Sequence, residues 1–586
     1  MSITPRGMSI QEAYRNYSEG KFLVNRKYQR KLVWTVDEKE YLIDSIINDL
    51  PIPLILLAQT EDGKLEIIDG LQRLNAIISF IENRFSKDNL FFDVTQSSRA
   101  NQSAEEGLFQ KTTEEDRLID AKACADFLDY QLAITIYPSS DEKEITDIFG
   151  RINSGGKQLS PQEKRQAGML DKFSDTIRKI SSEIRGDSSK DLLGLAEMPE
   201  ISIDSTREKI GYGLIAEEIF WCKHGIIWKK QLRDSEDEEV ILDLVATILK
   251  AEPLAKSREL FNKIYTSDSD EHTELNAELI KYGVDRLTHE IKVTFSIIES
   301  VFEEQNTTII NVVNPKSRNP VKESFFSIFM AFFHLVVSEE KSPAESDKIV
   351  LALKDLQKKM TSTANYAVSA DRENNINLTT GLIQKFFVKK DPPVLKHGAG
   401  LALDFENSIR RAKIESNRYE CKQGFFDLSD KRSINEKLYS EIIETLCGIA
   451  NVGPDADGFL FIGVADKISD AERIQALDRI EFRTINSRYI VGIDRELSLS
   501  NWSYDDYINK VLGKISSSGL SEPLKSQILS QLDIVEYKTL SIIRIRVPAQ
   551  NDLSFIGESS FIRENSKTIN LEGPKLIAAS KLFNKK

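Results

Sequence analysis

The sequence predicts a multidomain α+β protein with an N-terminal α/β part, a central helical part and a C-terminal α+β part. The chain has 586 residues, which at roughly 100 to 200 residues per domain corresponds to about three to five domains. Apolar residues alternate or form short runs towards both ends of the chain, but recur at helical spacing in the middle. The segment KKDPPVLKHGAG at 389–400 interrupts the helical pattern with proline and glycine, and we interpret it as a hinge.

The first predicted domain, residues 1–165, alternates helical and strand patterns. The helix VDEKEYLIDSIINDL precedes two strands, PIPLILLAQ and KLEIIDG, and a second helix, LQRLNAIISFIENRF. A further strand is expected over 130–137 and a helix over 141–152. The polar segment 101–116 is typical of a mobile insertion. Together these elements predict a small α/β domain.

The second predicted domain, residues 166–388, has helical periodicity almost throughout. The SPQE sequence at 160–163 just before it has the pattern of a capping box, with proline at the first helical position. We expect the acidic tract 235–239 and the polar segment 266–274 to be solvated loops between helices. The apolar stretch 325–337 is too short to span a bilayer and predicts a buried core helix.

The third predicted domain, residues 401–586, follows the hinge and mixes helices with strands. Its predicted order is helix 402–415, strand 418–422, helix 434–450, strand 459–464 and a strand pair near 533–547.

Composition excludes several classes of function. The 78 basic and 92 acidic residues give a net charge of −14, so any contact with nucleic acid has to come from a local basic surface. The four cysteines are far apart and lack metal-ligand spacing, which indicates a reduced, cytoplasmic protein without a zinc site. No signal-peptide pattern is seen at the start, so we expect no membrane association. All five histidines lie within 224–397, which excludes histidine catalysis at either end.

The sequence DGLQR at 69–73 lies where a strand ends and a helix begins. Free backbone amides and the helix dipole make such a turn suitable for an anion, and Arg73 could bind a phosphate or a carboxylate there. In the plainer alternative, Asp69 caps the helix and Arg73 pairs with a surface acid.

Other motifs on either side of DGLQR favour the first interpretation. With YQR at 28–30 and Trp34 before it, and FGRIN at 149–153 and two glycines after it, the turn resembles the N-terminal domain of the GmrSD restriction endonuclease family. The resemblance covers about residues 10–170 and implies a ParB- and sulfiredoxin-like fold that binds and hydrolyses nucleoside triphosphates. The nucleotide-binding residues it implies are Arg30, Asp69, Gly70, Gln72, Arg73 and Asn153, with Asp69 organising the turn and a magnesium ion.

Two features depart from that family. Leu71 stands where the family usually has glutamine, which puts hydrolysis in doubt more than binding. Family members often end in an HNH nuclease domain, but this chain has no histidine after position 397. Its C-terminal effector is therefore expected to be of another kind.

A second group of charged residues suits metal-dependent chemistry. Glu420 and Lys422 are two apart on a predicted strand and so share a face, Glu415 lies just before them, and Asp466 ends the strand FLFIGVAD. Three acids and a lysine suit magnesium-assisted phosphodiester cleavage. The plainer alternative is a solvated strand edge.

The surrounding sequence, including ETLCGIAN and FIR at 561–563, resembles the Schlafen AlbA-like domain over about residues 405–575. That family is often described as DNA-binding, and some members cleave RNA with three carboxylates. The resemblance implies that Glu415, Glu420 and Asp466 bind Mg²⁺ or Mn²⁺, with Lys422 beside them in the catalytic site. Because the loop 451–458 is longer than the family's turn, Asp455 or Asp457 could replace Asp466.

Basic residues near this site could guide a phosphate backbone, although charge runs more commonly form the solvated face of a helix. The candidates for nucleic-acid binding are Arg410, Arg411, Lys413, Arg418 and Arg563.

We therefore predict a bacterial antiphage defence protein in which a ParB-like sensor of nucleoside triphosphate controls a Schlafen-like, metal-dependent nuclease, a hydrolase acting on DNA or RNA. The alternatives are a nucleotide-regulated nucleic-acid-binding protein that does not cut, and a scaffold with both sites inactive. The sequence leaves open the trigger, the nucleotide base, RNA or DNA as substrate, and whether the chain forms a homo-oligomer.

Overall fold

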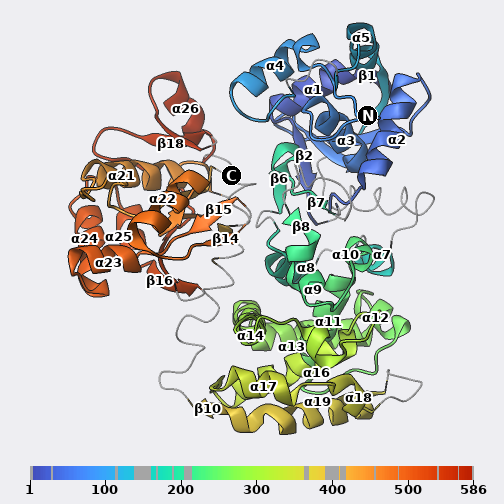
Figure 1. The fold of residues 1–586 in the computed structure, drawn as a ribbon. Helices are drawn as coiled ribbons and strands as arrows, with labels where there is room; N and C mark the ends of the chain where they lie inside the picture. The colour runs from blue at the N-terminus through green and yellow to red at the C-terminus, as the bar shows by residue number, and fades with distance from the viewer. Residues whose placement is uncertain are drawn as a thin grey trace.

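The structure is a computed structural model, in which Figure 1 shows three parts along the chain, coloured blue to cyan, green to yellow and orange to red. The residues that it describes are 4–27, 29, 31–112, 117–137, 160–166, 169, 171–187, 191–202, 214–361, 368–389, 405, 408–409, 417–454, 457–485, 487–537, 540–564 and 566–583.

A six-stranded mixed sheet organises the first part, with the strand order β1-β5-β3-β4-β2-β6. In that order the strands are Thr4–Ser9, Gln131–Tyr137, Ile55–Gln59, Leu65–Asp69, Phe22–Asn25 and Leu192–Gly194. β5 pairs in parallel with β3, and β2 with β4, while the other neighbours are antiparallel. β3 and β4 are each buried over four consecutive residues, which explains why their sequences are apolar runs instead of alternating patterns.

Five described helices accompany this sheet: α1 (Ile10–Ser18), α2 (Val36–Ile47), α3 (Leu71–Ile81), α4 (Ser98–Glu105) and α5 (Ala121–Asp129). α3 is buried along nearly its whole length. Its Phe80 ring contacts the rings of Phe92 and Phe127 edge-on, with centroids 6.2 and 5.4 Å apart. The α/β architecture predicted for this part is thus present, and α3 lies at its centre.

Two details of the first part differ from the sequence prediction. β6 pairs with β2, and Leu193, Leu195 and Met198 enter the same core, so the first sheet crosses the predicted boundary at residue 165. A three-residue strand is too short to show a periodicity of two. The segment 101–116 does not begin as a mobile insertion, because α4 covers residues up to 105 and buries Ala100; residues 113–116 lie outside the described chain.

The second part is helical, as predicted. Its helices are α7 (Pro161–Gln166), α8 (Lys172–Arg185), α9 (Phe220–Lys223), α10 (Lys229–Arg233), α11 (Glu236–Lys250), α12 (Arg258–Ile264), α13 (Asp270–Tyr282), α14 (Val284–Glu303), α15 (Ile309–Val313), α16 (Lys322–Phe333), α17 (Ser346–Ala352), α18 (Leu356–Lys359) and α19 (Ser369–Ile383). The predicted capping box is present, because the Ser160 amide donates to Glu163 and the Glu163 amide to Ser160 Oγ. Short strand pairs β7–β8 (Ile201–Ser202, Leu214–Ile215) and β9–β10 (Lys341–Pro343, Phe387–Lys389) flank the helices.

An aromatic cluster forms the centre of this helical core. Trp221 lies against Phe295 and Phe325 at centroid distances of 5.3 and 5.8 Å, and α16 is the buried helix that the apolar stretch 325–337 predicted. In the described chain, no helix combines the length and apolarity needed to cross a bilayer.

The two segments expected to be solvated loops are largely helical. α11 begins at Glu236, and Asp237 and Glu238 are buried. They sit beside buried cations, which the local sequence does not reveal. In the segment 266–274, Ser269 caps α13 by accepting from the His272 amide at 3.1 Å, so the polar residues there mark a helix start.

The third part contains a four-stranded sheet in the order β11-β12-β17-β16 and a three-stranded sheet in the order β13-β15-β14. The strands are β11 (Tyr419–Lys422), β12 (Gly458–Ile462), β13 (Val464–Ala465), β14 (Arg483–Ile485), β15 (Arg488–Ile490), β16 (Leu532–Tyr537), β17 (Leu540–Val547) and the hairpin β18–β19 (Phe561–Glu564, Lys567–Asn570). β11 and β12 are parallel, in register from Tyr419 with Phe459 to Lys422 with Ile462. The predicted strands at 418–422, 459–464 and 533–547 are all present.

The helices of this part are α21 (Lys437–Ala450), α22 (Ile468–Asp478), α23 (Asp494–Ser500), α24 (Tyr504–Ser516), α25 (Leu524–Leu529) and α26 (Pro574–Ser580). One face of the main sheet, including Leu460 and Ile543, packs with α21, α24 and α25, while Phe461 and Ile542 share the opposite face with Phe405 and Ile409. Most of the predicted hinge and of helix 402–415 lies outside the described residues, and Lys389 belongs to β10.

Candidate functional site

The DGLQR turn joins β4 to α3 through a left-handed glycine. Gly70 has a φ of 99°, and a Cβ atom there would come within 2.9 Å of Ile55 Cγ1, so both the backbone and the space require glycine. Asp69 Oδ1 accepts from the Gly70 amide at 2.8 Å, and its other oxygen pairs with Arg73 at 2.8 Å. Because Gly70 has no side chain to cap α3, the first amides of the helix have no side-chain partner from the capping position.

Gln72 is used to hold the neighbouring segment that contains Trp34. Its Oε1 accepts from the amides of Val33 and Trp34 at 3.1 and 3.2 Å, and its Nε2 donates to the Lys31 carbonyl at 2.6 Å. Gln29 of the YQR motif does the reverse, donating to the carbonyls of Ile67 and Ile68 at 2.7 and 2.6 Å. Each glutamine therefore binds backbone groups next to the other motif, which the sequence did not predict.

A hollow of about 680 Å³ lies beside this turn. Its lining includes Arg73, the rings of Trp34 and Tyr41, and the apolar segment 50–53. Arg73 is held at its edge by Asp69 and by the Leu54 carbonyl, to which it donates at 3.0 Å. The volume and the mixture of aromatic walls with a few polar groups match ordinary small-molecule sites.

Some residues that the sequence placed in the nucleotide site cannot be located. Tyr28, Arg30 and Asn153 lie outside the described residues, whereas Asp69, Gly70, Gln72 and Arg73 lie within one turn of chain. Of the residues that can be located, Arg73 lines the hollow directly.

Buried ion pairs connect the YQR segment to the helical part. Lys31 lies 3.2 Å from Asp237, and Arg26 lies 2.5 Å from Asp187. Arg185 contacts both Asp187 and Asp237. Burial alone would raise the pKa of Asp237, but Arg185 and Lys31 hold that pKa below its usual value. The carboxylate is therefore ionised, and a buried charge network spans the two parts.

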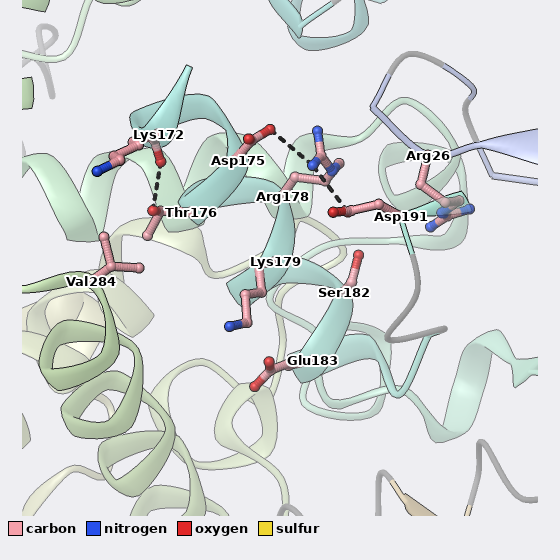
Figure 2. A pocket seen from close by; sticks show the side chains of 10 residues that line it. All are labelled: Arg26, Lys172, Asp175, Thr176, Arg178, Lys179, Ser182, Glu183, Asp191 and Val284. Atoms are coloured by element: carbon pink, nitrogen blue, oxygen red, sulfur yellow. Dashed lines mark hydrogen bonds and ion pairs between the residues drawn. The ribbon is translucent and has the colours of Figure 1, made fainter. Parts of the chain in front are cut away.

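Figure 2 shows a second hollow, of about 510 Å³, along α8. Cations and acids both line it, and Arg178 pairs with Asp175 at 2.9 Å and with Asp191 at 3.3 Å. Lys172 and Lys179 are exposed on the same helix. Both hollows have a paired guanidinium at their lining, but the described lining of the hollow along α8 includes no aromatic ring, unlike that of the hollow beside Arg73.

The third part brings together the charged residues that the sequence singled out. Glu420 and Lys422 project from the same face of β11, and their side chains pair at 2.8 Å. The other Glu420 oxygen pairs with Arg563 of β18 at 2.6 Å. Asp466 directly follows β13 and pairs with Arg488 of β15. We refer to these five residues as the charged cluster.

The pKa of Asp466 reflects the charges around it in the cluster. Burial raises the pKa of Asp466, Arg488 lowers it, and the negative charge of Glu420 raises it further. The net pKa of Asp466 is raised, so its charged form is held at a cost. Asp457, considered as an alternative third acid, is instead bound to Arg546 and accepts from the Ala549 amide at 2.9 Å; Asp455 lies outside the described residues.

Asn451 positions the strand that carries Arg563. Its side chain is fully buried, donates to the Phe561 carbonyl at 2.8 Å and accepts from the Ser554 amide at 2.7 Å. Sequence reasoning noted Asn451 only as the start of a long turn and did not single out Arg488. The signal for Asn451 was its place at the end of a helix next to a glycine-rich turn, whereas nothing local marked Arg488.

The predicted basic surface differs from what the structure describes. Arg418 and Arg563 are 2% and 5% exposed, so neither belongs to an open basic face. Arg410, Arg411, Lys413 and Glu415 lie outside the described residues. Within the described residues, no three His, Cys, Asp or Glu side chains come close enough together to hold a metal ion. Glu420 and Asp466 supply the carboxylate oxygens that Mg²⁺ and Mn²⁺ prefer, so the type of donor fits such an ion. The predicted third ligand, Glu415, lies outside the described residues.

Comparison with known proteins gives a family match within the first part of the chain and its immediate surroundings. Residues 10–170 match the family described as the GmrSD restriction endonuclease, N-terminal domain. The matched range contains the DGLQR turn, Trp34 and the hollow beside them, and it agrees with the resemblance drawn from the motifs. No curated protein and no solved structure matches the chain.

Proposed function

We propose that this chain is a phage-defence protein in which nucleoside triphosphate bound at the first part controls metal-dependent cleavage of nucleic acid by the third. The observation that carries the proposal is the charged cluster, in which Glu420 pairs with Lys422 and its charge raises the pKa of Asp466, in a chain whose residues 10–170 match a restriction-endonuclease domain. Two acids and a lysine at the end of a sheet suit phosphodiester hydrolysis without histidine.

The nucleotide site is supported by the arrangement around the turn. Arg73 offers a guanidinium beside a hollow of ligand size, at the start of a helix whose dipole favours an anion. Asp69 fixes the guanidinium from one side, so a phosphate would bind its remaining donors. Leu71 is buried and contributes no polar group, which favours binding over hydrolysis at this site.

In the cleavage site, Glu420 and Asp466 would hold Mg²⁺ or Mn²⁺, which supplies an activated water and screens charge when bound. Both carboxylates are paired with cations in the described structure. A phosphate backbone would draw Lys422 and Arg488 towards itself, because they are about a quarter exposed. Each phosphodiester cut adds the oxygen of water to phosphorus and releases a sugar oxygen, with no change in redox state.

Control of one site by the other needs a physical connection. The buried pair Lys31–Asp237 joins the segment held by Gln72 to α11, and the pair Arg26–Asp187 joins the first part to the chain just after α8. Both pairs connect the first part to the helical part, which is the first step of a connection towards the third. A ligand that moves this segment would also disturb the buried charges, which are costly to separate.

A second candidate is a nucleic-acid-binding protein that does not cut. The full pairing of Glu420 by Lys422 and Arg563 favours it, because an acid that stays paired positions the cations and does not bind a metal. We keep it as the alternative that the experiment below distinguishes.

The test is cleavage of labelled RNA, single-stranded DNA and double-stranded DNA by the purified full chain, with Mg²⁺ or Mn²⁺ and nucleoside triphosphates. Wild-type protein is expected to cut at least one substrate, and Glu420→Gln, which keeps shape but removes a charge, should reduce the rate at least about a hundredfold. Glu564→Gln, on the neighbouring exposed strand end, is the matched control and should cut normally. If wild-type protein cuts no substrate with any metal, the nuclease proposal is wrong and nucleic-acid binding without cleavage is the remaining function.

A further inference from the structure

We propose that the hollow beside Arg73 binds the base of the nucleoside triphosphate by stacking on Tyr41 and Trp34, with the phosphates directed to Arg73. This inference rests on the proposed nucleotide site and adds the part of the ligand that the DGLQR turn does not explain. No motif of the sequence assigned a position for the base.

Exposed apolar surface marks the hollow as a binding site. Tyr41 is 76% exposed, and Leu50 and Leu54 are 51% and 50% exposed. Tyr41 and Leu50 line the hollow with Pro51 and Pro53. Large side chains clustered in this way on a surface usually mark a binding site, and a tyrosine ring with no burial to gain contributes little to folding.

The surroundings fix the backbone that carries the two aromatic side chains before a ligand arrives. The Trp34 amide is bound by Gln72, and Thr35 starts α2 with a capping box in which the Thr35 amide donates to Glu38 at 3.0 Å. Tyr41 lies six residues further along the same helix. A backbone that is fixed before the ligand arrives loses little entropy on binding. Stacking on the rings should therefore raise the measured affinity for nucleotide.

Charge separates the two ends of the ligand. Arg73 is the cation of the lining, whereas Asp37 and Glu38 at the start of α2 are acidic. Glu38 is engaged by Thr35 and by Arg233. Phosphates are repelled from the acidic helix start and attracted to Arg73, so the uncharged base is the part that fits between the rings and the proline segment. Every base has a stacking face, which makes such a wall tolerant of base identity.

The experiment compares inorganic tripolyphosphate with the four ribonucleoside triphosphates by isothermal titration of the full chain. Tyr41→Ala should weaken binding of the nucleotides by about tenfold, the size of one base–aromatic stack, and should leave tripolyphosphate within twofold of wild type. Tyr41→Phe, which keeps the ring, is the matched control and should bind both as wild type does. Arg73→Ala should weaken both ligands by about tenfold or more.

Outcomes separate this inference from the proposed site on which it rests. If Tyr41→Ala leaves the affinity for both ligands unchanged while Arg73→Ala lowers both affinities, the base does not stack here and the proposed triphosphate site is retained. If Tyr41→Ala weakens tripolyphosphate as much as the nucleotides, the ring acts on the phosphates or on the fold, and the base inference is wrong. Wild-type protein that binds no nucleoside triphosphate would overturn both. Circular dichroism of each variant checks folding, which the exposure of Tyr41 predicts to be unchanged.

Discussion

In the first part of the chain Gln72 of the DGLQR turn binds backbone groups and Arg73 pairs with the single acid Asp69, whereas in the third part several charged side chains bind one another. Gln72 and Gln29 tie two motifs together and leave Arg73 beside an open hollow. Glu420, in contrast, has a cation on each carboxylate oxygen, and Asp466 has Arg488. Arg73 therefore lies at the edge of a hollow with one paired acid, whereas the acids of the charged cluster would have to exchange partners before a metal could bind.

This difference indicates which site responds first. A preformed hollow can bind nucleotide at little conformational cost, while the charged cluster becomes available to a metal only when something competes for its cations. Nucleic acid is the natural competitor, because its phosphates bind lysine and arginine. The two sites are therefore suited to a sensor and to an effector that stays inactive without substrate.

The largest expected effect concerns the buried network that joins the first part to the helices. Arg185→Met leaves Asp187 and Asp237 buried with one cation fewer, and such losses cost about 3 to 5 kcal/mol. We expect the free energy of unfolding to fall by about that amount in chemical denaturation.

Lys64→Met is the control for this prediction, because the Lys64–Asp62 pair is exposed and surface pairs contribute little. If Arg185→Met unfolds at the same denaturant concentration as Lys64→Met, the network does not bind the two parts together, and control through it loses its physical basis.

A second prediction tests the exchange of partners in the charged cluster. Mn²⁺ affinity of the full chain should increase by about tenfold when a phosphorothioate oligonucleotide that resists cleavage is bound, a usual size for coupling between two sites. Titration of Mn²⁺ by electron paramagnetic resonance measures this. Equal Mn²⁺ affinity with and without oligonucleotide would contradict the comparison between the two sites.

The same titration gives a pH dependence with a defined sign. The pKa of Asp466 is raised by burial, and a metal binds the ionised carboxylate. Lowering the pH should therefore weaken Mn²⁺ binding at a pH above the ordinary range of an aspartate. Asp466→Asn should remove that dependence together with much of the affinity.

The smallest expected effect compares two amides that serve the two sites. Gln72→Ala and Asn451→Ala each leave backbone groups without a partner, which costs about 1 to 3 kcal/mol of stability. Gln72→Ala should weaken nucleotide binding without changing nucleic-acid binding, and Asn451→Ala, which loosens the strand of Arg563, should do the opposite. Thermal unfolding and the two binding assays measure this, and equal losses in both assays for either variant would show that the amide acts on the whole fold.

The sequence predicted those features that depend on local pattern. The capping box at Ser160, the shared face of Glu420 and Lys422 and the strand-to-helix turn at DGLQR all follow from residues close together in the chain. The family match over residues 10–170 was also predicted from short motifs that occur in a fixed order along the chain.

Features created by distant contacts could not be predicted in that way. β6 is three residues long and belongs to the first sheet only because it reaches β2. Asp237 has the sequence context of a solvated tract and is buried because Arg185 and Lys31 surround it. Arg488 of the charged cluster pairs with Asp466, and Asn451 binds the strand that carries Arg563, in both cases through partners far away in sequence. Their roles depend on contacts made by the tertiary fold, and a local sequence pattern does not reveal such contacts.

The claim that nucleotide in the first part controls cleavage in the third is tested most directly by one measurement. The rate of nucleic-acid cleavage by the full chain is followed at saturating Mg²⁺ while nucleoside triphosphate is titrated from zero, with wild-type protein and with Arg73→Ala. We predict that the wild-type rate changes by about tenfold or more over the titration, the scale of an ordinary allosteric coupling, and that Arg73→Ala needs a higher nucleotide concentration for the same change. A wild-type protein that cuts at the same rate with and without nucleotide would contradict the account.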